Sequence, residues 1–201
     1  MKIPIFVKLL IVLAIFALFA ALAFLFVRNS YNTLVNLEEG VISQWAQVEN
    51  VYQRRADLIP NLVSVVKGYA AHERETLEAV VEARNLAYGA AIDPRNINPE
   101  TIAQFQATQD GLSSALSRLM VVVEAYPDLK AYQGFLNLQT QLEGSENRIA
   151  NARRKYAEAV RDYNISIREF PRNIFANMFG FEPKAHFEAA EGAEVVPEIV
   201  F

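Results

Sequence analysis

The chain of 201 residues contains no cysteine. Disulfide bonds are therefore excluded, and cysteine chemistry cannot indicate the cellular compartment. Histidine is scarce, with two residues. His72 opens the segment HERET, which has Thr76 where a zinc-protease motif requires its second histidine. His186 is far along the chain from any base or orienting partner. The sequence therefore predicts no metal site and no catalytic residue.

Acidic residues suited to metal chemistry also lack their partners. Glu73, Glu75, Glu78 and Glu82 follow one another in a helical pattern. A helical di-metal cluster needs a Glu-x-x-His pair on each of two helices, so a solvated face with intrahelical ion pairs explains them better. The chain has no nucleophile elbow, phosphate loop or metal-ligand spacing, and we expect no enzymatic activity and no cofactor. A hidden hydrolase would need a pocket with perturbed carboxylates between helices.

An excess of positive charge is absent from most of the chain. All 23 acidic residues follow Arg28, whereas Lys2, Lys8 and Arg28 are the only basic residues up to that position. Nucleic-acid binding needs a basic surface that neutralises phosphates, and polybasic lipid recognition needs clustered Lys and Arg. The charge pattern excludes nucleic acid as a partner and argues against a polybasic lipid-binding face.

One long hydrophobic run is present, at residues 9–27, LLIVLAIFALFAALAFLFV. A helix of about 20 apolar residues crosses a bilayer. A cleaved signal fits less well, because the small residues Ala21 and Ala23 are followed by FLFV and a signal core has about 7–15 residues. We expect residues 1–28 to form a retained single-pass membrane anchor whose partner is the lipid bilayer.

Small residues on this anchor suggest how it packs. Ala14, Ala17 and Ala21 fall on one helical stripe, and small residues at such spacing let membrane helices approach closely. They are candidate anchor-packing residues; the alternative is a lipid-facing anchor with incidental alanines.

Helical periodicity continues beyond the anchor. A stripe with spacings of three and four residues consists of Leu34, Leu37, Val41, Trp45, Val48 and Tyr52. Nothing between Val27 and Leu34 stops a helix, so the anchor and the first helix after it are expected to be continuous. The clearest loop is at residues 87–100, and Asn98-Pro99 at its end predicts the start of the next helix.

The last long helix shows a seven-residue repeat. Its large members are Phe135, Leu142, Ile149, Tyr156, Tyr163 and Phe170, and its second column holds Leu138, Ser145, Ala152, Ala159 and Ser166. This coiled-coil-like alternation predicts a closely packed neighbour along about 40 residues. No strand signal competes. The predicted fold is all-α, with the transmembrane helix followed by an antiparallel up-and-down four-helix bundle over residues 29–170.

The segment VYQRRADLIPNLV, residues 51–63, decides the number of helices. Proline inside a helix costs about 3 kcal/mol, and Asp57 suits an N-cap. We therefore expect a helix corner formed by Arg54, Arg55, Asp57 and Pro60. The alternative, favoured by the absence of glycine here, is a long first helix kinked at Pro60 in a three-helix bundle.

The paired arginines of this segment are interpreted as structural. A cation near a helix C-terminus gains a few tenths to about 1 kcal/mol from the macrodipole, and Asp57 can pair with one of them. The alternative is that Arg54 and Arg55 bind a phosphate or a lipid head group. No second basic cluster or glycine-rich loop supports that alternative.

The C-terminal tail, residues 171–201, is first apolar and then acidic. Phe175, Phe179 and Phe181 lie in a stretch with little polar cover, and residues 182–201 hold five glutamates and one lysine. Such a patch packs on the protein itself, binds another chain or touches a membrane. The acidic charge disfavours an anionic membrane, so the three phenylalanines are a candidate partner surface if they do not pack on the bundle.

The segment YNTLVNLEEGVISQWAQVENVYQRRADLIPNLVSVVKGYAAHERETLEAVVEAR, residues 31–84, resembles the signature region of the LemA family. The resemblance continues in residues 163–189, YNISIREFPRNIFANMFGFEPKAHFEA, and in the terminal VPEIVF. It implies a bacterial protein with one N-terminal membrane helix, a four-helix up-and-down bundle and no known catalytic residue. One relative in that family takes part in building magnetosome membranes.

Two indications of the membrane topology disagree. Lys2, Lys8 and the free amine outnumber Arg28, so the positive-inside rule favours a cytoplasmic N-terminus by a margin of one or two charges. The family resemblance implies a short external N-terminus and a cytoplasmic bulk. The side of the bundle is left open between them.

These observations predict a non-enzymatic, membrane-anchored helical scaffold in the bacterial inner membrane. Its expected role is to self-associate as a homo-oligomer or to organise a membrane or membrane proteins. The alternative is an adaptor or sensor subunit for a membrane protease or transporter, which would bind a membrane-protein partner.

Overall fold

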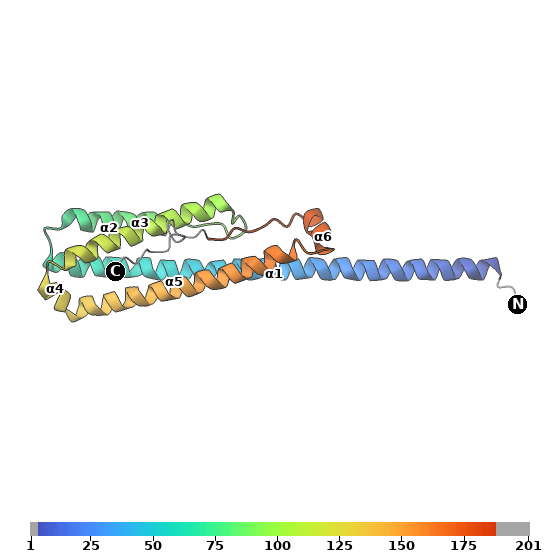
Figure 1. Cartoon of the computed structure of the whole chain (residues 1–201), viewed down its shortest axis with the longest axis horizontal. Helices are drawn as coiled ribbons and strands as arrows, with labels where there is room; N and C mark the ends of the chain where they lie inside the picture. Colours follow the sequence, from blue (N-terminus) through green and yellow to red (C-terminus); the bar gives the residue numbers. More distant parts are fainter. Residues whose placement is uncertain (1–3, 188–201) are drawn as a thin grey trace, which may run out of the picture. The chain divides into compact units, whose positions relative to one another are not determined.

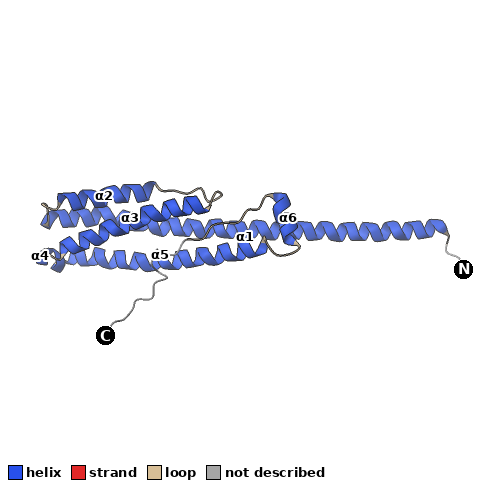
Figure 2. Ribbon diagram, turned by 45° about the horizontal axis from the view of Figure 1, so that its top comes forward, coloured by secondary structure: helices blue, strands red, loops and turns tan. Residues whose placement is uncertain are grey.

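The computed structural model describes residues 4–187, and every regular element within that range is a helix (Figure 2). The elements are α1 (Ile5–Tyr69), α2 (Arg74–Gly89), α3 (Pro99–Val123), α4 (Pro127–Ala131), α5 (Gln133–Ser166) and α6 (Arg172–Phe179). The all-α prediction is confirmed. The terminal VPEIVF and the other tail residues from 188 onward lie outside the described residues.

The chain forms two compact units. The anchor unit comprises Met1–Gly40 and Arg161–Pro183, and the bundle unit comprises Val41–Val160 and Lys184–Phe201. Helices α1 and α5 each contribute residues to both units. The predicted continuity of the anchor with the first helix after it is confirmed, because α1 runs from Ile5 to Tyr69 without a break.

The bundle unit is an antiparallel up-and-down four-helix bundle, built from the later part of α1 with α2, α3 and α5 (Figure 1). Every one of these helices contributes to a single buried core, for example through Leu62, Val80, Leu112 and Phe135. The short helix α4 closes the core with Leu129, which is fully buried. Burial of these apolar faces stabilises the bundle through the hydrophobic effect.

The predicted apolar patterns coincide with the buried faces. Val41, Trp45 and Val48 on α1 are fully buried. On α5, the large members of the seven-residue repeat from Phe135 to Tyr163 are buried as predicted, while Ala159 of the second column is half-buried. The prediction is wrong for the last member, Phe170, which is 81% exposed because α5 ends four residues earlier, at Ser166.

The predicted helix corner at Arg54, Arg55, Asp57 and Pro60 is wrong, because α1 continues through all four residues. The alternative correctly predicted a long first helix. It was wrong about a three-helix bundle, because the chain turns after that helix, at residues 70–73, and α2 then supplies a further helix. An interior proline leaves the carbonyl four residues earlier without its helical donor. Here that carbonyl belongs to Ala56, and the Nε of Arg84 on α2 donates to it at 3.4 Å. A neighbouring helix thus partly replaces the missing bond.

The start of α3 follows the local sequence closely. The Asn98 side chain accepts from the backbone N–H of Thr101 at 2.9 Å, and the Thr101 hydroxyl accepts from the backbone N–H of Asn98 at 3.0 Å. This reciprocal capping box, with Pro99 at the first helical position, satisfies N–H groups that a helix start leaves unpaired. The predicted start of this helix is confirmed.

The chain after α6 returns to the bundle unit through Lys184–Phe187. The Phe187 ring stacks on Trp45 with centroids 5.9 Å apart and meets Tyr156 edge-on at 5.5 Å. The guanidinium of Arg153 lies 4.3 Å from the centre of the same ring. Aromatic and cation–π contacts to the Phe187 ring therefore hold this segment on the bundle unit.

Two hydrogen bonds fix the backbone path of the same segment. The Tyr156 hydroxyl donates to the carbonyl oxygen of Ala185 at 2.8 Å, and burial raises the pKa of Tyr156 well above its ordinary value. The phenol is therefore a neutral donor at every physiological pH. The Lys184 ammonium, which is buried, donates to the carbonyl oxygen of Arg95 at 3.2 Å.

Replacement of Phe187 tests whether this segment is an integral part of the bundle. We expect Phe187→Ala to lower the free energy of unfolding by about 2–3 kcal/mol, because a partly buried ring and its aromatic contacts are lost. The melting temperature of the purified full-length chain should fall by about 5–10 °C. The neighbouring His186 is exposed, so His186→Ala is the matched control and should change stability by less than about 0.5 kcal/mol. Equal melting temperatures for the two variants would contradict this role of Phe187.

Candidate functional site

A buried arginine lies at the centre of the bundle unit. Arg55 is 2% exposed, and its guanidinium donates to three side chains and one carbonyl on other helices. Nη1 donates to the Ser113 hydroxyl at 3.1 Å and to the Glu146 carboxylate at 2.9 Å. Nη2 donates to the side-chain oxygen of Gln109 at 2.8 Å and to its backbone oxygen at 3.4 Å. One side chain of α1 thereby connects α3 and α5.

Gln109 extends the network to the fourth helix. Its side-chain amide donates to the carbonyl oxygen of Ala87, on α2, at 3.1 Å. The Ser113 hydroxyl also donates to the carbonyl oxygen of Gln109 at 3.0 Å. A buried charge is costly unless it is paired and hydrogen-bonded, and these bonds satisfy both terminal nitrogens of the guanidinium. Glu146 is 57% exposed, so its carboxylate also keeps contact with solvent.

The four residues of the predicted corner therefore have different roles. Arg55 is structural, but its carboxylate partner is Glu146 rather than the expected Asp57. Arg54, Asp57 and Pro60 are exposed on α1. The guanidinium of Arg55 is enclosed and committed to protein acceptors, which leaves it no surface for a phosphate or a lipid head group.

Sequence reasoning missed Gln109, Ser113 and Glu146. A signal for the first was present. Gln109 stands between Phe105 and Leu112, at spacings of four and three residues, and so occupies a core position of the α3 stripe. A polar residue at such a position demands a buried partner. The same spacing distinguishes the two arginines: Arg55 lies three residues after Tyr52 and four before Ile59, on the buried stripe of α1, whereas Arg54 does not.

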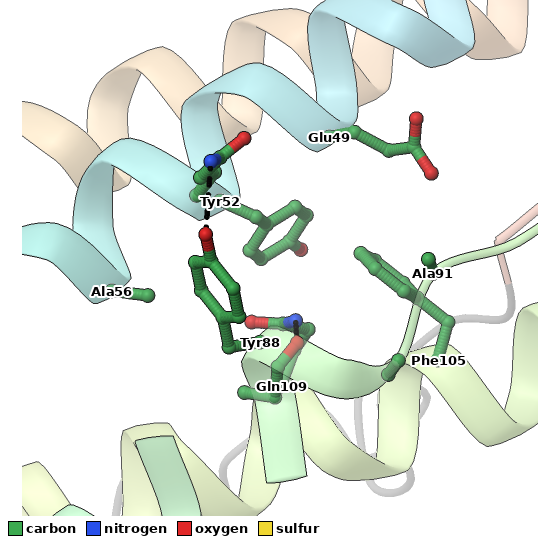
Figure 3. A pocket seen from close by; sticks show the side chains of 10 residues that line it. Glu49, Tyr52, Ala56, Tyr88, Ala91, Phe105 and Gln109 are labelled. Carbon is green, nitrogen blue, oxygen red and sulfur yellow. Dashed lines mark hydrogen bonds between the residues drawn. The ribbon is translucent and has the colours of Figure 1, made fainter. Parts of the chain in front are cut away.

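Beside this network lies a small open pocket of about 260 Å³ (Figure 3). Figure 3 shows the Tyr88 phenol reaching across it toward α1, where Gln53 donates to the phenol oxygen at 3.4 Å. Among its lining residues, Glu49 is the only acidic or basic side chain. The other titratable groups in the lining are the phenols of Tyr52 and Tyr88, and no second carboxylate accompanies Glu49. The pocket therefore lacks the pair of perturbed carboxylates that a hydrolase would need.

A larger apolar groove of about 850 Å³ runs between α1 and α2. Its apolar lining includes Val63, Leu77, Val81 and Leu86, of which Val81 is 41% and Leu86 62% exposed. Two of the acidic residues predicted to form a solvated face, Glu78 and Glu82, border it, and Glu78 accepts from Arg74 at 2.6 Å. Across residues 4–187, no group of three or more His, Asp or Glu side chains is arranged to hold a metal ion.

The anchor unit contains one helix segment long and apolar enough to cross a membrane, among the described residues. Its apolar side chains, such as Phe16 (74%) and Phe19 (68%), are largely exposed. Ala14, Ala17 and Ala21 are also exposed along this segment. An all-round apolar helix without protein cover is typical of a membrane span.

Helix α6 packs on α1 within the anchor unit through the three phenylalanines predicted as a partner surface. Phe175 meets Phe26 with ring centroids 6.0 Å apart, and Phe179 and Phe181 meet Tyr31 at 5.0 Å and 5.8 Å. Gly180 ends α6 in the left-handed region at φ 76°, where glycine is favoured, and turns the chain so that Phe181 also reaches Tyr31. These rings contact the chain's own first helix.

The segment after α6 is tied to α5 inside the same unit. The Tyr163 hydroxyl donates to the carbonyl oxygen of Glu182 at 3.0 Å. Burial raises the pKa of Tyr163 well above its ordinary value, and the carboxylates of Glu38 and Glu182 add to the effect. The phenol stays protonated and keeps donating across the physiological pH range.

The contrast between the two adjacent arginines allows a matched test of the buried network. We expect Arg55→Ala to lower the free energy of unfolding by about 2–4 kcal/mol. The substitution removes charge-assisted hydrogen bonds and leaves the side-chain oxygen of Gln109 buried without its donor. Arg54→Ala, at an exposed position, should cost less than about 0.5 kcal/mol. Arg55→Lys should not restore stability, because an ammonium cannot reproduce the planar fork. Thermal unfolding of the purified variants measures all three, and comparable melting temperatures for Arg54→Ala and Arg55→Ala would refute the network's contribution.

Comparison with known proteins identifies the family. A model described as LemA family matches residues 44–201. Magnetosome protein MamQ 1 of Paramagnetospirillum magneticum is 29% identical over 197 residues, which covers 89% of this chain and 71% of that protein. Magnetosome protein MamQ of Magnetospirillum gryphiswaldense is 26% identical over 214 residues, covering 96% and 78%. Protein LemA of Metamycoplasma hominis is 27% identical over 139 residues, covering 69% and 59%.

None of these names denotes an enzyme. The apolar first helix and the relatives together indicate a membrane-associated helical protein. The matched region extends over most of the bundle unit and far beyond half of the chain. The chain belongs to the LemA family.

Proposed function

We propose that this protein is a non-enzymatic scaffold held in the bacterial inner membrane by a single pass of α1. The observation that carries the proposal is the exposed apolar segment of α1, whose surface needs a lipid environment, joined in one chain to a bundle built around a structural buried charge. The residues that line the small pocket supply one isolated carboxylate. Among the described residues, the features that support a function are apolar surfaces and not clusters of reactive side chains.

The length of the apolar segment supports membrane insertion. At 1.5 Å per residue, the 19 residues from 9 to 27 extend for about 28 Å, close to the roughly 30 Å of a bilayer's hydrocarbon core. The segment has no charged residue. Arg28 follows it directly, at the position where a charge first reaches the polar interface.

Self-association is the second part of the proposal. The exposed stripe of Ala14, Ala17 and Ala21 offers a surface on which the backbone of a second anchor can approach closely. The magnetosome proteins among the relatives are named for a membrane-bounded compartment, which favours organisation of a membrane over a role in solution. A homo-oligomer would present several bundles at one membrane site.

Light scattering on the detergent-solubilised protein tests self-association. We expect a protein mass above the 22.6 kDa of one chain at micromolar concentration. Ala17→Leu should shift the protein toward the monomer, because a larger side chain separates the helices. Ala23→Leu is the control, since Ala23 lies on the opposite side of the helix at about 100° per residue. A clean monomer for the unaltered chain, or equal effects of both substitutions, would contradict association through this stripe.

An adaptor or sensor role for a membrane protease or transporter is the second candidate. The apolar groove between α1 and α2, with Leu86 exposed at its edge, favours it. Affinity purification from native membranes separates the two roles, because an adaptor should bring one second polypeptide in fixed ratio and a scaffold mainly itself. Leu86→Glu should abolish recovery of that second polypeptide and leave self-association unchanged.

The two opposing indications of topology are resolved by labelling. Asn50 is exposed on the bundle unit, and the chain has no cysteine of its own. If the charge bias around the anchor governs insertion, Asn50→Cys reacts with a membrane-impermeant maleimide in intact cells. If the arrangement implied by the family governs it, the same thiol reacts only after the cells are opened.

A further inference from the structure

Helix α6 is held at one particular level of the apolar segment of α1 (Figure 1). Phe26, which contacts Phe175, is the second-to-last residue of the run at 9–27. Tyr31, which contacts Phe179 and Phe181, follows five residues later, about 7.5 Å further along the helix axis. The contacts of α6 therefore begin where the hydrocarbon segment ends and continue into the region where head groups would lie.

A second face of α6 has no protein cover within the anchor unit. Ile174 and Met178, one helical turn apart, are 54% and 62% exposed. Phe170, two residues before α6 begins, is 81% exposed. The buried residue of α6 is Ala176. One side of this helix thus packs on α1, and another presents large apolar side chains outward.

The charges around this face fit a membrane surface better than the acidic tail suggested. Arg168 and Arg172 flank the start of α6, with Glu169 between them and Glu182 three residues after its end, and Arg28 follows the apolar run in the same unit. Arg172 is held in place by bonds to the Ser166 hydroxyl at 3.0 Å and to Glu169 at 3.3 Å. Aromatic residues such as Tyr31 are typical of the interface, where the ring is apolar and the hydroxyl is wet.

From these contacts we infer that α6 is an interfacial helix, lying on the bilayer with Phe170, Ile174 and Met178 inserted at the boundary between head groups and acyl chains. The inference rests on membrane insertion of α1, as proposed above, and the occupant it assigns to the exposed face is lipid. Short amphipathic helices with large apolar residues bind membranes this way, to a depth of about 5–10 Å. A second copy of the chain is the competing occupant.

Spin labels on single cysteines test this placement, with the full-length protein in phosphatidylcholine vesicles. The chain has no cysteine to remove. Ile174→Cys and Met178→Cys report on α6, Leu18→Cys reports on the middle of the span, and Asn36→Cys, exposed nine residues beyond Val27, reports on water. The quantity measured is accessibility to oxygen, which concentrates in lipid, relative to a water-soluble nickel chelate.

We expect the oxygen-to-nickel ratio at Ile174→Cys and Met178→Cys to be several-fold above that of Asn36→Cys and below that of Leu18→Cys, at any ratio of protein to lipid. Water-like values on α6 together with a lipid value at Leu18→Cys would overturn the interfacial helix and leave the anchor standing. A water-like value at Leu18→Cys would overturn the anchor itself. Protection of α6 from both reagents that disappears on tenfold dilution with lipid would assign the face to a second copy and also overturn the inference.

Discussion

The apolar surface of α1 is the constraint on which the rest of this structure depends. Apolar area is unstable in water and must be covered, at roughly 25 cal/mol per Å². Along residues 9–27 the apolar side chains point to every side of the helix, and most of that surface has no protein cover, which suits a lipid environment. From Val41 to Val66 the same helix is apolar on one stripe, which three neighbouring helices cover. The same helix therefore has two surface patterns, apolar on every side in its first part and apolar on one stripe in its later part.

Inside the bundle, apolar packing is combined with one buried hydrogen-bond network, whose geometry is strict. Core methyl and phenyl groups tolerate small shifts of one helix against another, whereas hydrogen bonds lose strength quickly with distance and angle. The bonds from Arg55 to α3 and α5, and from Gln109 to α2, can form together only when all four helices have their observed alignment. This buried network explains why a charged residue occupies the core, where its guanidinium is enclosed by protein.

The C-terminal part of the chain completes each unit in turn. In the anchor unit, the rings of α6 and Phe181 pack on Phe26 and Tyr31. In the bundle unit, Phe187 fills a space among Trp45, Phe105 and Tyr156. The likeness to the LemA family includes these C-terminal residues. In both units a late segment covers apolar surface that the long helices alone would leave exposed.

The sequence by itself determined the apolar helical segment near the start of α1, the all-helical class, the buried stripes and the start of α3. Each of these depends on local spacing: an unbroken apolar run, a period of three to four residues, or a cap beside a proline. Tertiary structure decided what happens at Pro60, because the lost helical bond is offset by Arg84 from another helix. It also decided which groups bind the buried guanidinium of Arg55, and that Phe175 contacts α1. Those outcomes depend on partners distant in the sequence, and the energy of such contacts exists only once the chain has folded.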